Sequence, residues 1–271
     1  YAKERKQGKA NNSDNKDADF IIKHADIRRS LMNMKSLIEG QRSLAFWVSQ
    51  QIDVSLNHSD TTIKKNANDM VSMMTPLIKS FFTDIGMEIT NDAIQVFGGY
   101  GYTKDQGVEQ LFRDNRITPI YEGTNSVQAI DLVFRKILNN NIYDNYIAQI
   151  TKEIQEYEKN KELALFVQKF QKYVELINNF TSWLIEKNKN SKDDVSAACN
   201  DYLKVLGYLG LAHSWLKILK VSYDKYDTNK SFFEDKINTA TYYFDKILPR
   251  AQSHYLSAIT GSKSMMKANF N

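Results

Sequence analysis

Apolar residues recur every three or four positions over most of the chain, and this spacing predicts long amphipathic helices. The first run covers residues 20–56 and the second covers residues 63–96, with turn and capping residues between them. Shorter helical runs follow at residues 108–115 and 124–138. Pro76 lies inside the second run, where it should kink the helix or mark a short first turn.

The second half of the chain has the same periodicity. It predicts helices over residues 146–188, 193–226 and 231–248. A polar segment at 139–145 separates them from the first half, and another at 187–194 separates the first of them from the second. Short connections between long helices are typical of antiparallel bundles, so this pattern indicates an all-α fold.

A length of 271 residues exceeds one typical domain of roughly 150 residues. We therefore predict two units, an antiparallel helical bundle over residues 1–140 and an additional helical domain over residues 141–271 with a core of its own. Gly207 and Gly210 lie inside a predicted helix, where they would let another helix pack close.

Composition excludes several classes of protein. The net charge is only +4, and Lys and Arg are interspersed with acidic residues, which argues against nucleic-acid binding. No stretch approaches eighteen consecutive apolar residues, so we predict no membrane span. The single cysteine, Cys199, excludes an internal disulfide, fits a reducing cytoplasm and is interpreted as a buried apolar residue. We assign no metal site.

The helical period breaks at residues 98–102 (GGYGY) and at residues 118–124 (TPIYEGT). A glycine pair followed by aromatic residues, with a second turn about twenty residues later, could form the walls around a flat ligand. The second break contains Glu122, between an aromatic residue and a glycine. A half-buried carboxylate there would have a raised pKa, as a general base requires.

Gly123 would let a substrate approach the backbone, and Thr124 offers a hydroxyl group and unpaired amides at a helix start. By themselves the residues favour a simpler alternative, in which Glu122 only caps the helix or forms a salt bridge with Arg116.

Several segments resemble the C-terminal signature of the acyl-CoA dehydrogenases: QVFGGYGY at 95–102, RDNRI at 113–117 and IYEGTN at 120–125. YAKERKQGK at residues 1–9 is similar to an upstream segment of that family, and the resemblance extends over residues 1–138. The downstream YYFDKILPRAQSHYLSAITGSKSMM resembles an extended bacterial branch that includes 3-methylmercaptopropionyl-CoA dehydrogenase-like enzymes.

The resemblance implies an FAD-dependent oxidoreductase of fatty acid metabolism, which forms the α,β-double bond of an acyl-CoA thioester. Glu122 would remove the α-proton while the β-hydrogen leaves as hydride to the flavin, and Gly123 would contact the substrate. The segment that would contact FAD comprises Thr124, Asn125 and Ser126, with Ser126 replacing the family's usual glutamine or glutamate.

A second group of residues would reach the FAD of a dimer partner, with Arg5 on its pyrophosphate: Arg5, Lys6, Gln7, Gln95, Val96, Phe97, Gly98 and Gly99. No phenylalanine follows Gln7, unlike in the family. His24 lies near a further FAD position or is an ordinary helix-start histidine.

The resemblance also implies a cytoplasmic homodimer formed through the bundle, with electron-transfer flavoprotein as electron acceptor. The chain begins at Tyr1 within an apparently helical segment, which suggests a piece of a longer protein. The family's N-terminal helical domain and β-domain supply most flavin and acyl-CoA contacts, so we expect this chain alone to be inactive and to retain little FAD. The alternatives are an acyl-CoA oxidase and a catalytically inactive helical interaction module.

Overall fold

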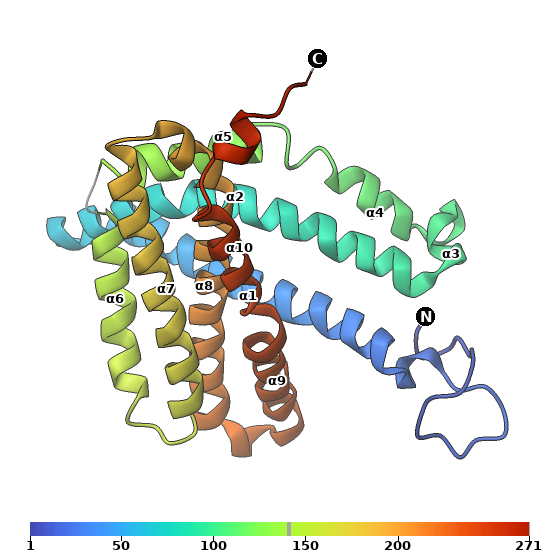
Figure 1. Ribbon diagram of the computed structural model, residues 1–271. Helices are drawn as coiled ribbons and strands as arrows, with labels where there is room; N and C mark the ends of the chain where they lie inside the picture. Colours follow the sequence, from blue (N-terminus) through green and yellow to red (C-terminus); the bar gives the residue numbers. More distant parts are fainter. Residues whose placement is uncertain (140–141, 271) are drawn as a thin grey trace.

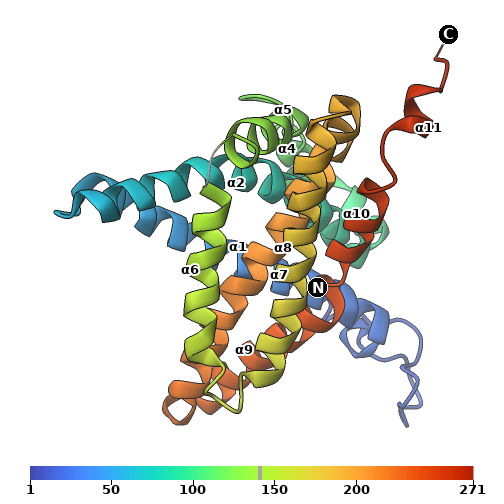
Figure 2. The same cartoon turned by 60° about the vertical axis from the view of Figure 1, so that its left-hand side comes forward.

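The computed structural model describes residues 1–139 and 142–270, and their secondary structure is helical apart from one isolated bridge between Lys6 and Phe20. This confirms the predicted all-α class. Two long helices form a hairpin that runs across an upright group of helices (Figures 1 and 2). The hairpin consists of α1 (Ala25–Asn57) and α2 (Thr61–Phe97), and the upright group of α6 (Ile142–Tyr157), α7 (Ala164–Asn188), α8 (Lys192–Asp224) and α9 (Lys230–Tyr242).

The hairpin agrees with the predicted helices at 20–56 and 63–96, except that a short 3-10 turn, η1 (Ile21–Lys23), precedes α1. Asp60 fixes the start of α2, because its carboxylate accepts hydrogen bonds from the amides of Thr62 (2.8 Å) and Ile63 (3.1 Å). Pro76 is buried within α2, and the helix continues on both sides of it.

The glycine pair ends α2 as predicted. Gly98 has φ 62°, a backbone conformation that favours glycine, and α3 (Gly99–Tyr102) and the 3-10 turn η2 (Lys104–Gln106) follow it. α4 (Val108–Asn115) then runs back along α2, and α5 (Asn125–Ile130) continues as a π-helical segment, η3 (Asp131–Ile137). The predicted helices at 108–115 and 124–138 are thus confirmed.

The predicted helix over residues 146–188 is wrong, because the chain forms α6 and α7 with a turn between them. Asn160 stabilises this turn, since its side-chain oxygen accepts a hydrogen bond from the amide of Glu162 at 2.9 Å. The predicted linker at 187–194 is also too long, because α7 reaches Asn188 and Ser191 caps α8. Of the predicted linker at 139–145, residues 140 and 141 lie outside the described residues, and α6 begins at Ile142.

The last predicted helix, over 231–248, is present as α9 followed by a π-helical segment, η5 (Tyr243–Ile247). Beyond Pro249 the chain continues as α10 (Arg250–Ala258) and α11 (Lys263–Met266), which complete the C-terminal part of the described chain.

α8 is the central element of the hydrophobic core. Its side chains are buried on all sides along much of its length, and it contacts α1 and α2 as well as α7, α9 and α10. Gly207 and Gly210 allow this, because a Cβ on Gly207 would lie 2.5 Å from the Phe81 ring of α2 and one on Gly210 would lie 3.3 Å from Leu44 of α1. One apolar cluster therefore includes residues from both sides of the predicted boundary near residue 140.

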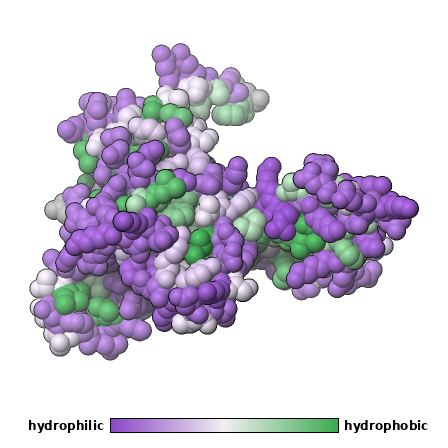
Figure 3. Space-filling view, turned by 90° about the horizontal axis from the view of Figure 1, so that it is seen from below, coloured by the Kyte–Doolittle hydropathy of each residue, from purple (hydrophilic) through white to green (hydrophobic). Residues whose placement is uncertain are grey.

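A smaller apolar cluster fixes the N-terminal segment. Ala2, Ile21 and Val96 form its buried centre, so residues 1–8 lie against the end of α2. The face seen from below in Figure 3 is mainly hydrophilic, and its apolar residues form small separate patches. Over residues 1–139 and 142–270, no helix is long and apolar enough to span a bilayer, and no group of three or more His, Cys, Asp or Glu side chains is arranged for a metal ion.

Candidate functional site

Glu122 lies in a bend with unusual backbone geometry. Its φ is 54°, and among the described residues it is the one non-glycine residue with positive φ. Gly123 follows with φ 84°, so two consecutive residues are left-handed. A non-glycine residue with this backbone conformation costs about 1–3 kcal/mol of stability. It persists where the surrounding structure enforces it, often at functional sites.

Asn125 anchors this bend to α2. Its side chain is buried, and its Nδ2 donates to Asp84 Oδ1 at 2.7 Å, with Thr83 Oγ1 and the Ser80 carbonyl oxygen at 3.0 and 3.1 Å. Its main-chain amide donates to the carbonyl oxygen of Pro119 at 3.0 Å. A buried amide that is fully hydrogen-bonded fixes both the position and the direction of the segment that carries it.

Two further side chains hold the carbonyl groups of the bend. Gln128 Nε2 donates to the carbonyl oxygen of Glu122 at 3.0 Å, and Lys79 Nζ donates to that of Gly123 at 2.6 Å. Thr124 starts α5, since its hydroxyl oxygen accepts a hydrogen bond from the amide of Val127 at 3.4 Å. Hydrogen bonds therefore attach the bend to α2 and to α5.

The Glu122 side chain is exposed and makes no ion pair with Arg116 or with any other described residue. The simpler alternative, a salt bridge or helix cap, is therefore not what the structure shows, because Thr124 provides the cap. The predicted half-buried position is not found in this chain either, because residues 121–124 are all exposed. Tyr121, its aromatic neighbour in the sequence, is itself exposed and leaves the carboxylate uncovered.

The two segments predicted to reach a partner's FAD come together in one groove. Arg5 and Gln7 line a pocket of about 360 Å³ with residues 95–98, and an adjoining pocket of about 330 Å³ extends it past Gly99 to Thr103. Arg5, Gln7 and Gln95 are exposed, so their donor groups are accessible from solvent. The groove thus combines a guanidinium group, two amides and a glycine-rich wall.

The N-terminal segment is positioned by main-chain hydrogen bonds and by ring stacking. The amide of Ile21 donates to the carbonyl oxygen of Arg5 at 2.8 Å, and that of Ile22 donates to Ala2 at 3.0 Å. The Tyr1 ring stacks on Phe97 with centroids 4.5 Å apart. These contacts join the start of the chain to the end of α2, and Tyr1 is a groove residue that the sequence analysis missed.

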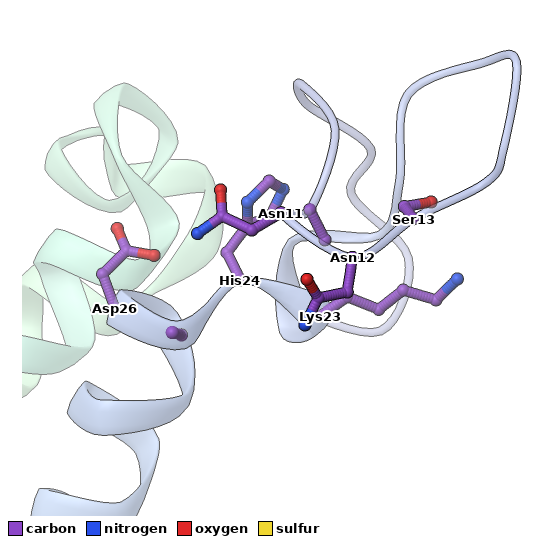
Figure 4. A pocket seen from close by; sticks show the side chains of 8 residues that line it. Asn11, Asn12, Ser13, Lys23, His24 and Asp26 are labelled. Atoms are coloured by element: carbon purple, nitrogen blue, oxygen red, sulfur yellow. The ribbon is translucent and has the colours of Figure 1, made fainter.

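A polar pocket of about 710 Å³ lies beside the groove, between the loop of residues 10–13 and the start of α1 (Figure 4). His24 and Asp26 line this polar pocket and also the 360 Å³ pocket of the groove. His24 is the N-cap residue of α1, as the helix-start alternative expects, and its Nε2 also lies 2.9 Å from the carbonyl oxygen of Gln7.

Other predicted residues point elsewhere. Lys6 places its ammonium group 5.0 Å from the centre of the Phe20 ring and does not line the groove. The Asn125 side chain is hydrogen-bonded to α2, and Ser126 Oγ accepts a hydrogen bond from Asn200 of α8 at 3.3 Å. The two helix breaks do not enclose one ligand within this chain, because they lie at opposite ends of α4 (Figure 1).

Cys199 and His213 are buried in the core, away from the bend and the groove. Cys199 is buried and free, as predicted, and burial raises the pKa of its thiol to about 12. His213 is buried beside Glu153, whose Oε2 lies 2.8 Å from its Nε2, and burial lowers the pKa of this histidine. Burial opposes ionisation of Glu153, but hydrogen bonds from His213 and Lys217 and the charge of Lys217 lower its pKa to about 2.

Two family models match adjacent parts of the chain. A model described as "Acyl-CoA dehydrogenase, C-terminal domain" matches residues 9–138, and one described as "Acetyl-CoA dehydrogenase C-terminal like" matches residues 147–269.

Curated relatives carry related names. A 3-methylmercaptopropionyl-CoA dehydrogenase of Ruegeria pomeroyi is 39% identical over 138 residues, which is 51% of this chain and 23% of the relative. A butyryl-CoA dehydrogenase of Syntrophomonas wolfei is 26% identical over 279 residues, which is 99% of this chain and 44% of the relative. The chain thus spans less than half the length of each.

A solved structure agrees in fold. The acyl-CoA dehydrogenase of Bacillus anthracis, crystallised with FAD, matches with a TM-score of 0.73 at 16% identity, over 98% of this chain and 46% of that one. The two family models, the named relatives and the fold agree with the predicted resemblance, and the chain therefore belongs to the acyl-CoA dehydrogenase family, of which it comprises the C-terminal helical region.

Proposed function

We propose that this chain is the C-terminal part of an FAD-dependent acyl-CoA dehydrogenase in which Glu122 removes the α-proton of an acyl-CoA thioester. The observation that carries the proposal is the bend at Glu122. It presents an exposed carboxylate that has no ion-pair partner in the part of the chain that the structure describes, on a left-handed backbone that a buried asparagine anchors to α2. A side chain kept available at such a cost fits a role toward a ligand.

The backbone of the bend fits the same role. Among the described residues, the amides of Glu122 and Gly123 donate no hydrogen bond, so each can donate to a ligand oxygen. An amide directed at the thioester carbonyl would stabilise the negative charge that develops when the α-proton leaves. Gly123 has no side chain to obstruct the approach of the thioester, and Glu122 takes up the proton once it lies within hydrogen-bond reach of the α-carbon.

The groove at the N-terminal segment fits a flavin dinucleotide. Arg5 supplies a guanidinium group for a pyrophosphate, and the amides of Gln7 and Gln95 supply further donors. Apart from the neighbours of Gly98 in the chain, no atom of the described residues lies within 4 Å of the position that a Cβ on Gly98 would take, so the wall is open to a ligand there. Held by these residues, FAD would supply the acceptor for the hydride from the β-carbon.

The groove and the Glu122 bend are separated by α4, which supports an arrangement with two copies of the chain. In a homodimer formed through the helical bundle, Arg5, Gln7 and residues 95–99 would bind the partner's FAD, while residues 124–126 would contact the FAD of their own copy. We further propose a cytoplasmic enzyme with electron-transfer flavoprotein as acceptor, and separate units over residues 1–140 and 141–271.

The test is the substitution Glu122→Gln in the full-length protein that carries this chain. The amide keeps the shape of the side chain but cannot accept the proton, so FAD content should be unchanged while anaerobic bleaching of the flavin by acyl-CoA is abolished. Asp114→Asn is the matched control, because Asp114 is exposed and lies outside the bend and the groove. Bleaching by the Glu122→Gln protein at the wild-type rate would refute the role of Glu122.

The wild-type protein distinguishes the alternatives in the same assay. A screen of short, long, branched and sulfur-containing acyl-CoA thioesters identifies the acyl chain. Stoichiometric peroxide formation in air would indicate an acyl-CoA oxidase. A protein that binds FAD but is bleached by none of the thioesters would be a catalytically inactive helical module.

A further inference from the structure

Lys79 is a half-buried residue of α2 whose ammonium group lies against the bend that carries Glu122. Its Nζ donates to the carbonyl oxygen of Gly123 at 2.6 Å and to Oδ1 of Asn125 at 2.9 Å. Lys79 makes no ion pair in the described part of the chain, so its charge is directed at these two oxygens. The first of them belongs to the residue directly after Glu122.

The bend depends on such contacts because it has no cover of its own. The side chains of residues 121–124 are exposed, and two consecutive residues have positive φ. A backbone of this kind persists only where its neighbours enforce it. Asn125 fixes the end of the bend. Gln128 holds the carbonyl group of the peptide directly after Glu122, and the charged donor of Lys79 holds that of the next peptide, between Gly123 and Thr124, with a hydrogen bond stronger than one between neutral groups.

We propose that Lys79 is a positioning residue for proton abstraction: its hydrogen bond to the Gly123 carbonyl sets the direction in which the Glu122 side chain leaves the bend. This inference rests on the proposed function of Glu122. A general base works only within hydrogen-bond reach of its proton, and a displacement of about 1 Å can cost about 100-fold in rate. Lys79 acts through the main chain and is assigned no contact with the substrate.

The test is Lys79→Met in the full-length protein, which removes the charge and keeps a side chain of similar length. The rate of anaerobic FAD bleaching by an acyl-CoA should fall about 10- to 100-fold, while the Kd for the thioester and the FAD content stay within about two-fold. The deuterium isotope effect with an α-deuterated thioester should rise, because proton removal becomes more fully rate-limiting. Lys79→Arg keeps a charged donor and should recover most of the rate.

The matched control is Lys64→Met. Lys64 belongs to the same helix, and its Nζ also donates to a main-chain carbonyl oxygen, that of Leu56, at 3.0 Å. That contact joins α1 to α2 at the other end of the hairpin, so Lys64→Met should bleach at the wild-type rate. An equal loss in both variants would overturn the inference, because any lysine of α2 would then have the same effect.

Hydrogen exchange separates positioning from a direct effect of charge. The amides of residues 117–128 should exchange faster in Lys79→Met than in the wild type and in Lys64→Met. A slower reaction with unchanged exchange would overturn the positioning role. If the wild-type flavin is bleached and Lys79→Met bleaches at the same rate, this inference alone is refuted. If no acyl-CoA bleaches the wild-type flavin, the proposed function is refuted, and the positioning role with it.

Discussion

Gly207→Ala should destabilise the protein, because there is no room for a methyl group at this position. The added Cβ would lie 2.5 Å from both Cγ and Cδ2 of Phe81, whereas carbon atoms in contact are normally about 3.5–4.0 Å apart. The ring cannot move away freely, since Phe81 is 1% exposed and packs edge-on against Tyr208 with centroids 5.1 Å apart. α8 and α2 would therefore have to separate by about 1 Å at this contact.

The magnitude follows from two opposing effects. Overpacking of a core costs about 1–3 kcal/mol, and the rigid ring places this site at the upper end. Replacing an interior helical glycine by alanine returns about 1 kcal/mol. The net loss is about 2 kcal/mol in the free energy of unfolding, which for a chain of this size lowers Tm by about 4–8 °C.

Gly210→Ala is the matched control on the same helix. Its Cβ would lie 3.3 Å from Cδ2 of Leu44, the end of a flexible side chain that can move by a few tenths of an ångström. The helix-propensity gain then remains, so Tm should stay level or rise slightly. Thermal unfolding followed by circular dichroism measures both variants in one buffer.

Two results would refute this reasoning. One is a Gly207→Ala protein that melts at or above the wild-type temperature. The other is an equal loss at Gly210, which would assign the cost to the helix backbone. A double-mutant cycle with Phe81→Leu adds a direct check, since Gly207→Ala should cost less once the ring is gone.

Three further predictions concern the groove, a buried histidine and the C-terminal segment. Arg5→Ala in the full-length protein should lose more FAD on dialysis than Lys3→Ala, whose side chain lies outside the groove; flavin absorbance per protein measures this. Burial lowers the pKa of His213, so the unfolded state binds more protons and Tm should fall below about pH 6.5, with a flatter profile for His213→Phe. Asp194 accepts hydrogen bonds from the amide and hydroxyl groups of Ser262, directly before α11. Asp194→Ala removes them and should speed proteolysis beyond residue 258, which mass spectrometry detects as a shortened chain.

The helical periodicity predicted most elements to within a few residues, because the apolar face of each long helix is fixed by local spacing. It missed the turn between α6 and α7, where Asn160 replaces the helical hydrogen bonds within a run that remains polar and helix-compatible. The two segments of the groove were singled out in advance, since both carry residues that resemble the family's motifs. Their meeting was not, because it depends on packing between the N-terminal segment and the end of α2.

The bend at Glu122 shows the same limit. The sequence indicated a turn with an important carboxylate, but it also suggested a half-buried side chain, and the structure leaves it exposed. Lys79 escaped attention because it lies 44 residues from the carbonyl group it binds. A hydrogen bond over that separation is a property of the folded chain, and no local pattern predicts it.

The shared core around α8 restricts how this chain can be divided or exchanged. Trp215 of α8 is completely buried, and its indole N–H donates to the carbonyl oxygen of Ser36 in α1 at 3.1 Å, beside Gly40. A protein truncated near residue 140 would leave this strip of α1 and the facing side of α2 bare, and would aggregate or refold differently. A chimaera that takes its C-terminal half from a distant relative would need compensating changes on both helices of the hairpin, because the apolar cluster includes side chains from both halves.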